Sequence, residues 1–202
     1  MASDDSMTGM GRQTKTTARK PRADAARNRE RLLVSATAIF GAGGPDASLE
    51  AVARHAGVGI GTLYRHFPNR EALFEAVYRH EVDQLGDLAE QLSQGSAAPV
   101  EALRRWLHAN VRLIATKKGM VAALELAAYG PPDLYAYSFD RLSKAASLLL
   151  DRAVAADAIR GDITAEDLLR TLVGMSKMHD QPGWQTTVLR FVDIFVDGLR
   201  VR

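Results

Sequence analysis

The chain has 202 residues, and 47% of them are hydrophobic, which is ample for a buried core in one large domain or two small ones. Cysteine is absent, which excludes a disulfide framework and thiolate metal sites. No apolar run approaches the roughly 20 residues that span a bilayer, and the N-terminal stretch lacks the apolar segment of a signal peptide. We therefore expect a cytoplasmic protein with no membrane partner.

Positive charge is concentrated at the start of the chain. The formal net charge is only +2, so composition alone does not indicate a nucleic-acid-binding protein. Acidic residues become common further along, and this asymmetry suits a chain with one end that meets a polyanion. For the residues before Arg22, a solvated tail that improves solubility is the alternative. The basic residues of this stretch are Arg12, Lys15, Arg19, Lys20, Arg22, Arg27, Arg29 and Arg31.

Helical spacing governs the sequence from Ala23 onward, and no segment has the period of two that is typical of a strand. The expected fold class is therefore all-α. Residues 1–22 are rich in Ser, Thr, Gly, Lys and Arg and have no apolar period, which predicts a disordered basic arm.

Short helices are predicted directly after the arm. The first ends in a run rich in glycine and proline, which cannot continue a helix cheaply. Ser48 caps the second helix and Gly57 stops it. The third helix runs from Ile60 to Phe67.

Longer helices are predicted for the rest of the chain. One from about Asn69 to Gln94 joins the two halves. Gly119 and the Gly-Pro-Pro run at 130–132 are interpreted as breaks. The further helices are expected at about 99–116, 119–129, 132–157, 165–179 and 184–200, which makes about nine helices in total.

Two short helices joined by a tight turn containing glycine form a helix-turn-helix, here over about 48–67. The second helix of such a motif enters the major groove of DNA. Because Leu63 and Phe67 are needed for packing, the other positions of that helix face outward. Most of them are small or hydrogen-bonding residues suited to base edges and phosphates. The candidate contacts are Ile60, Gly61, Thr62, Tyr64, Arg65 and His66.

The stretch at 56–74, together with the patterned helix before it, resembles the TetR family of transcriptional regulators. The resemblance runs from about Ala25 to Tyr78. It implies a three-helix DNA-binding domain over 23–80, followed by a helical effector-binding and dimerisation domain over 81–202.

The resemblance also implies roles for single residues. Ser48 matches the position that opens the second helix at the DNA backbone, and Thr62 and Tyr64 match contact positions of the recognition helix. Arg70 stands where a lysine usually grips a phosphate, and arginine keeps the charge and adds a forked donor. Gly59 departs from the family pattern, in which Ser is frequent, and brings no side-chain acceptor.

Other interpretations of the same stretch are weaker. Tyr64 packing in the core is the alternative to a DNA contact. His55 and His66 lack the paired spacing of a zinc site. The glycine-rich run from Gly57 is like a dinucleotide-binding loop, but it ends in Thr62 and follows a helix rather than a strand. We therefore expect no metal and no cofactor.

An apolar cavity with a few polar anchors is expected in the C-terminal half, where aromatic and methionine residues recur. Ordinary core packing is the alternative for each of them taken singly. Tyr129 precedes the Gly-Pro-Pro run, a hinge-like break at which a ligand would change a helix angle. The candidate effector-binding residues are Trp106, Met120, Leu124, Tyr129, Tyr135, Phe139, Met175, His179 and Trp184.

The last two predicted helices each have a strongly apolar face. The resemblance implies that they pair with a second subunit in a four-helix interface, and reading two half-sites also needs two-fold symmetry. The alternative is that both faces fill the core of their own domain. The expected interface residues are Leu168, Leu172, Val188, Phe191, Val192, Phe195 and Leu199.

These observations predict a repressor that binds a palindromic operator in double-stranded DNA as a homodimer and is released by an unidentified small-molecule effector. An activator or a DNA-organising protein with the same head is one alternative. An all-helical enzyme is the other, but the sequence offers no acid–base pair or activated nucleophile for it.

Overall fold

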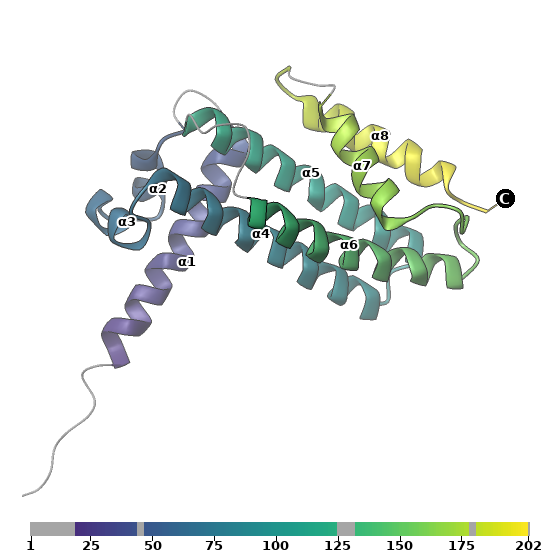
Figure 1. Ribbon diagram of the computed structural model, residues 1–202, viewed down its shortest axis with the longest axis horizontal. Helices are drawn as coiled ribbons and strands as arrows, with labels where there is room; N and C mark the ends of the chain where they lie inside the picture. The colour runs from purple at the N-terminus through teal and green to yellow at the C-terminus, as the bar shows by residue number, and fades with distance from the viewer. Residues whose placement is uncertain (1–18, 44–46, 125–131, 178–180, 202) are drawn as a thin grey trace, which may run out of the picture.

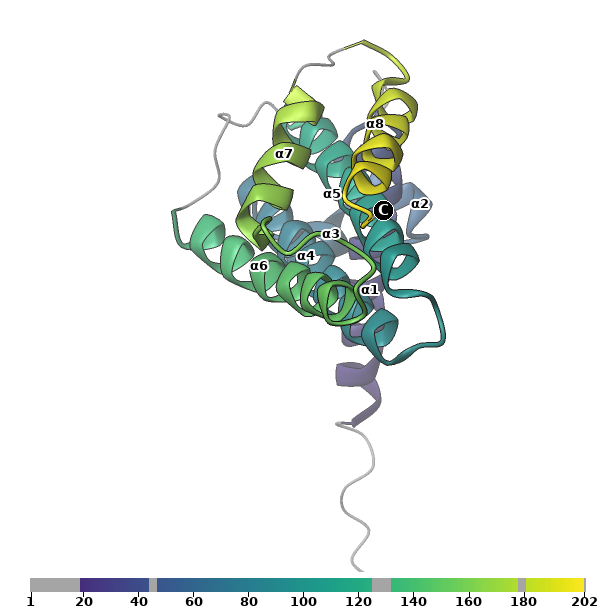
Figure 2. The same ribbon diagram turned by 90° about the vertical axis from the view of Figure 1, so that its right-hand side faces the viewer.

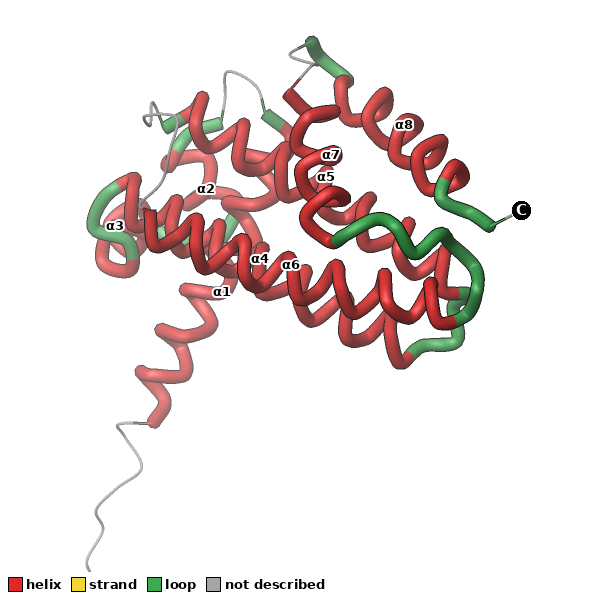
Figure 3. Tube along the Cα trace, turned by 45° about the vertical axis from the view of Figure 1, so that its right-hand side comes forward, coloured by secondary structure: helices red, strands yellow, loops and turns green. Residues whose placement is uncertain are grey.

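The computed structural model describes residues 19–43, 47–124, 132–177 and 181–201. These residues form eight helices, and their only extended pairing is an isolated bridge between Ile159 and Arg200 (Figure 3). The predicted all-α fold is confirmed. The helices are α1 (Arg19–Ala42), α2 (Leu49–His55), α3 (Ile60–His66), α4 (Arg70–Gln94), α5 (Pro99–Ala123), α6 (Pro132–Ala155), α7 (Ala165–Lys177) and α8 (Trp184–Gly198).

The helices form a small head and a larger helical body (Figure 1). Helices α2 and α3 lie against the C-terminal half of α1 at one end of the molecule, and the first turns of α1 project away from it. Helix α4 leaves the head and packs along α5 and α6. Helices α7 and α8 pack on each other and on α5 at the far side of the body (Figure 2). Among the described residues, no helix combines the length and the apolar character needed to cross a membrane.

Local rules account for the helices of the head. The Ser48 hydroxyl accepts a hydrogen bond from the Ala51 amide at 3.1 Å, which caps α2 as predicted. Gly59 occupies the N-cap of α3 without a side-chain bond, also as predicted. Leu63 and Phe67 are almost fully buried, so the inner face of the third helix is the one expected from the sequence.

Helix α1 begins before the predicted boundary of the arm. The structure places Arg19 in its first turn, whereas the sequence interpretation began the helix at Ala23. Pro21 is compatible with this start, because the first turn of a helix does not need that amide as a donor. The rest of the predicted arm, residues 1–18, lies outside the described residues.

The predicted break at Gly119 is wrong, because α5 continues without interruption from Pro99 to Ala123. The glycine serves a different purpose there. A Cβ atom at residue 119 would overlap the carbonyl oxygen of Phe40 in α1. Helix α5 therefore rests directly on the backbone of α1, and eight helices are described instead of about nine.

We expect Gly119→Ala to lower the free energy of unfolding by about 1–3 kcal/mol, because the added methyl group forces α1 and α5 apart. Urea denaturation measures this change. Gly61→Ala is the matched control, since Gly61 also lies in a helix but a Cβ there meets nothing within 4 Å. The control is expected to be neutral or stabilising by up to about 1 kcal/mol. Equal effects of the two substitutions would contradict the close-approach argument.

Candidate functional site

The outer face of α3 carries the predicted DNA contacts. Tyr64 is 45% exposed and Ile60 39% exposed, while Leu63 between them is fully buried. Gly61 and Arg65 are exposed, and Thr62 and His66 are half-buried. The structure therefore brings these candidates together on one short helix at the outer end of the head (Figure 1). Tyr64 is not a core aromatic in this chain.

Arg65 orders the polar groups of this face. Its Nε donates to the carbonyl oxygen of Gly61 at 3.2 Å, and its Nη2 donates to the Thr62 hydroxyl at 3.0 Å. A hydroxyl both accepts and donates, so the Thr62 oxygen that accepts from Arg65 can still donate its own hydrogen outward. Thr62 is thereby suited to an acceptor on a base edge.

Basic residues of α1 lie beside the helix-turn-helix. Gly57, in the turn, has a φ of +65°, and a Cβ there would lie 2.6 Å from Nη2 of Arg31. The left-handed backbone favours glycine at this position, and the flexible end of the Arg31 side chain lies against it. The Arg29 guanidinium lies 5.5 Å from the ring centroid of Phe67. The sequence placed both arginines in a general basic stretch, and only the fold shows which elements they contact.

The two remaining DNA candidates lie at helix starts. Ser48 is half-buried at the N-cap of α2, where its hydroxyl is engaged by Ala51. Arg70 is the first residue of α4 and is exposed. Its Nη1 donates to the carbonyl oxygen of Leu124 at 3.3 Å, a contact with the end of α5 that the sequence did not predict.

The candidate effector residues do not gather around one cavity. Trp106 is fully buried, and its indole nitrogen donates to the Leu85 carbonyl at 2.9 Å. Met120 and Leu124 belong to the apolar core that the head shares with the end of α5. Trp106 belongs instead to the apolar core of the body, so the three residues lie in two separate cores, both of which contain residues of α5.

The other effector candidates lie nearer the surface or outside the described residues. Tyr135 and Phe139 are 38% and 50% exposed on α6. Phe139 borders a shallow depression whose described lining comes from α6 alone, so it is an open surface and not an enclosed pocket. Met175 and Trp184 are partly buried against the core of the body. Tyr129 and His179 lie outside the described residues.

Two consecutive lysines of α5 lie among these aromatic residues, and sequence reasoning missed them. Lys117 Nζ donates to the Tyr135 hydroxyl at 2.7 Å and lies 5.3 Å from the ring centroid of Tyr78. Lys118 Nζ donates to the Ser176 carbonyl at 2.8 Å and lies 4.4 Å from the ring of Trp184. The signal in the sequence was a pair of lysines in a largely apolar helix.

The expected dimer residues differ in exposure. Five of them are at most 5% exposed and pack into the core of their own chain: Leu168, Leu172, Val188, Val192 and Leu199. This burial favours the alternative of internal packing for these five. In the expected set, Phe195 is half-buried and Phe191 is 39% exposed. The apolar side chains that α7 and α8 present outward are Val173, Phe191 and Ile194, the last at 62% exposure.

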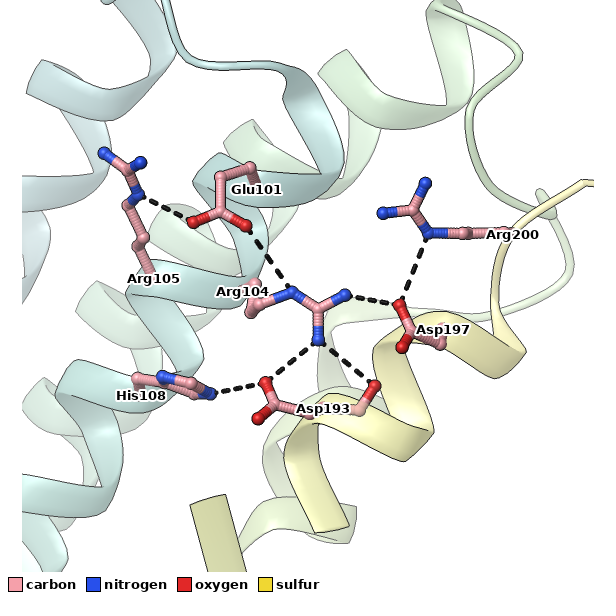
Figure 4. Close-up of polar contacts among 7 residues, drawn as sticks. All are labelled: Glu101, Arg104, Arg105, His108, Asp193, Asp197 and Arg200. Carbon is pink, nitrogen blue, oxygen red and sulfur yellow. Dashed lines mark hydrogen bonds and ion pairs between the residues drawn. The ribbon is translucent and has the colours of Figure 1, made fainter. Parts of the chain in front are cut away.

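A charged cluster holds α8 on α5 (Figure 4). Arg104 of α5 donates through Nη1 to both the backbone oxygen and Oδ1 of Asp193, at 3.2 and 2.9 Å, and through Nη2 to Asp197. His108 Nε2 lies 2.8 Å from the same Asp193 Oδ1. Asp193 and Asp197 are one turn apart in α8, so a single guanidinium spans a full turn of that helix.

The cluster shifts the titration of Asp193. Partial burial alone would raise the pKa of this carboxyl, but hydrogen bonds and positive charge from Arg104 and His108 outweigh it and hold the pKa below its ordinary value. A carboxyl with a lowered pKa in the folded state stabilises the fold at neutral pH. That stabilisation is lost as the pH falls through the lowered pKa.

We expect Arg104→Met to lower the free energy of unfolding at pH 7 by about 1–2 kcal/mol, since it removes hydrogen bonds between charged groups that are partly exposed. Arg105→Met is the matched control, because Arg105 is mostly exposed and pairs with Glu101 within α5. Its effect should stay within about 0.5 kcal/mol. Denaturation over a series of falling pH values should shrink the difference between the two variants, because the contribution of Asp193 is lost as the pH falls through its lowered pKa. A difference that does not change with falling pH would contradict the role of the carboxylate.

A helix-turn-helix head joined to a larger helical body defines a DNA-binding transcriptional regulator. The family profile of bacterial regulatory proteins of the tetR family matches residues 32–77. The profile of the C-terminal domain of SbtR-like transcriptional regulators matches residues 98–201. The chain belongs to the TetR family, as the sequence resemblance implied.

Solved structures agree with this assignment. A TetR transcriptional regulator from Streptomyces coelicolor is 40% identical, with a TM-score of 0.73, over 85% of this chain and 98% of that chain. A TetR transcription regulatory protein from Mycobacterium vanbaalenii is 34% identical, with a TM-score of 0.68, over 90% of this chain and 99% of that chain.

Among curated proteins, the HTH-type transcriptional repressor LfrR of Mycolicibacterium smegmatis is 33% identical over 106 residues, which are 49% of this chain and 56% of the relative. The uncharacterized regulator TtgW of Pseudomonas putida is 43% identical over 61 residues, 30% of this chain and 46% of the relative. The chain thus spans about half the length of the curated relatives it matches.

Proposed function

We propose that this chain is a transcriptional repressor that binds a palindromic operator as a homodimer and leaves it when a small molecule binds the body. The observation that carries the proposal is the outer face of α3, where Thr62, Tyr64 and Arg65 stand at the end of the molecule above a buried Leu63. The relative LfrR is named a transcriptional repressor, which supports repression rather than activation for this chain.

The chemistry of the head suits the major groove. Gly61 adds no side chain, so the backbone of α3 can approach base edges closely. Thr62 and Tyr64 supply hydroxyl groups for base edges or phosphates. Arg29 and Arg31 add positive charge beside the motif, which favours a polyanion over a protein partner.

Selection of binding sites from a random DNA pool with the full chain tests DNA binding and symmetry together. The expected product is an inverted repeat whose half-sites are centred about one helical turn, roughly 34 Å, or a multiple of it apart. A pool without enrichment would overturn the proposal, and enrichment of an unpaired half-site would overturn the dimer. Overlap of the operator with a promoter then indicates repression, whereas a site upstream of it favours an activator.

On the selected operator, Thr62→Ala is expected to relax the preference at one base position, with a loss of about 1–3 kcal/mol for the preferred base. Arg70→Ala should instead weaken binding on all sequences alike and reduce the magnitude of the salt slope by about 1. Fluorescence anisotropy across a salt series and a set of single-base operator variants measures both quantities. A uniform loss for Thr62→Ala would refute its assignment to a base edge.

The dimer is proposed to form through the outward side of α7 and α8. Val173 of α7 and Phe191 and Ile194 of α8 are large apolar residues that stay exposed in the single chain. The two helices lie together on the side of the body away from α3 (Figure 2). A contact between two such faces leaves both α3 helices accessible, as binding to two half-sites requires.

We expect Ile194→Glu to convert the protein to a monomer and to weaken operator binding, because a carboxylate would be buried without a partner at the centre of the interface. Sedimentation velocity measures the oligomeric state. Val34→Glu is the control, since Val34 is an exposed apolar residue of α1 at 51% exposure and lies outside this face. A dimer that survives Ile194→Glu but not Val34→Glu would place the interface elsewhere.

The effector is proposed to bind in the body, near the lysines and aromatic residues at the C-terminal half of α5. Lys117, Lys118, Tyr135 and Trp184 join α5 to α6, α7 and α8 there, so a ligand among them would contact several helices at once. Coupling between effector and operator must be reciprocal. Compounds that raise the melting temperature of the chain should therefore bind more weakly when operator is present, and equal affinities would rule out release by that compound.

A further inference from the structure

Arg70 connects the head to the end of α5. It is the first residue of α4, and its side chain is exposed. Its Nη1 nevertheless donates to the carbonyl oxygen of Leu124, the C-cap residue of α5, at 3.3 Å. Carbonyl groups at a helix C-terminus lack intrahelical donors and lie at the negative end of the helix dipole, which makes them good partners for a guanidinium.

The end of α5 is itself fixed in the head. Met120 and Leu124 are at most 3% exposed and share the apolar cluster of Leu63 and Phe67. The C-terminal half of α5 thus packs in the apolar cluster to which the recognition helix also contributes. The position of the Leu124 carbonyl, which accepts from Arg70, therefore depends on how α5 lies.

The Leu124 contact leaves Arg70 able to bind DNA. A guanidinium has five N–H donors in a fixed plane, and the bond to Leu124 uses one of them. A phosphate therefore does not need to displace the carbonyl. A carbonyl at one edge of the plane fixes the orientation in which the remaining donors meet a phosphate, which reduces the side-chain freedom that binding would otherwise remove.

We propose that the Leu124 carbonyl aims Arg70 at a DNA phosphate, so that Arg70 is a positioning link between α5 and the operator as well as a phosphate contact. This inference rests on the proposed DNA binding of the head. Through this link, a ligand bound in the body can lower the affinity of the head for DNA. A ligand that shifts the end of α5 moves the Leu124 carbonyl away from Arg70 and so weakens the phosphate contact without contacting α3. By the reciprocity of coupled sites, operator binding stabilises the last turn of α5.

Hydrogen exchange of the amides at 121–124 in the full chain tests the link without DNA. Arg70→Ala is expected to speed their exchange by about two- to tenfold, the factor that corresponds to one ordinary hydrogen bond. Arg54→Ala is the matched control, because Arg54 is an exposed arginine of α2 in the head to which we assign no contact with DNA or with α5. It should leave these amides unchanged. Unchanged exchange in Arg70→Ala would overturn the proposal.

The same amides are then measured with saturating amounts of the selected operator. Wild type and Arg54→Ala should gain protection at 121–124, whereas Arg70→Ala should not. Arg70→Lys keeps the positive charge but lacks the planar guanidinium with its several donors. It should therefore bind operator more tightly than Arg70→Ala, but without added protection of the amides at 121–124. Operator binding by wild type with no change at 121–124 would reduce Arg70 to a plain phosphate contact. A chain that enriches no operator at all would instead refute the proposed function, so the two failures are distinguishable.

Discussion

Helix α5 can lie on helix α1 only because residue 119 has no side chain. The glycine lets the backbone of α5 rest against the Phe40 carbonyl, and the next turn of α5 then enters the core of the head. Any larger residue would separate the two helices and draw Met120 and Leu124 out of that core. The packing of α5 on α1 therefore depends on this close approach, while α4, which contacts α1, α5 and α6, also joins the head to the body.

The head is not a closed unit. Its apolar cluster contains residues of α1 to α4, but also Leu113, Met120 and Leu124 of α5 and Leu134 of α6. This apolar cluster therefore continues across residue 80, near which the sequence predicts a domain boundary. Because interiors are close-packed and shift between discrete arrangements, we expect a displacement of α5 to reach the recognition helix through packing. Arg70 instead connects the end of α5 to the first residue of α4.

Local chemistry explains which features the sequence predicted. Ser48, Leu63 and the turn at Gly57 obey rules that act within one or two helical turns, so the helix-turn-helix was readable without the fold. The sequence predicts the end of a helix at both Gly57 and Gly119. Gly57 lies in a left-handed turn, whereas Gly119 lies inside α5 where this helix packs against α1. That distinction depends on a partner 79 positions away, as counted from Phe40 to Gly119, which no spacing rule contains.

The face proposed for the dimer could not be read from the sequence for the same reason. Leu172 and Ile194 are both apolar residues in amphipathic helices, yet α5 and α6 cover the first and leave the second exposed. Arg104 decides part of this outcome, because its bonds to Asp193 and Asp197 fix the rotation of α8 about its own axis. Helix α5 has 25 residues, about 37 Å of straight helix. Near its first residues, α5 contacts α8 through Arg104, and at its C-cap residue it contacts the head through Leu124. In the proposed dimer, the tilt of α5 would therefore set the distance between the two heads.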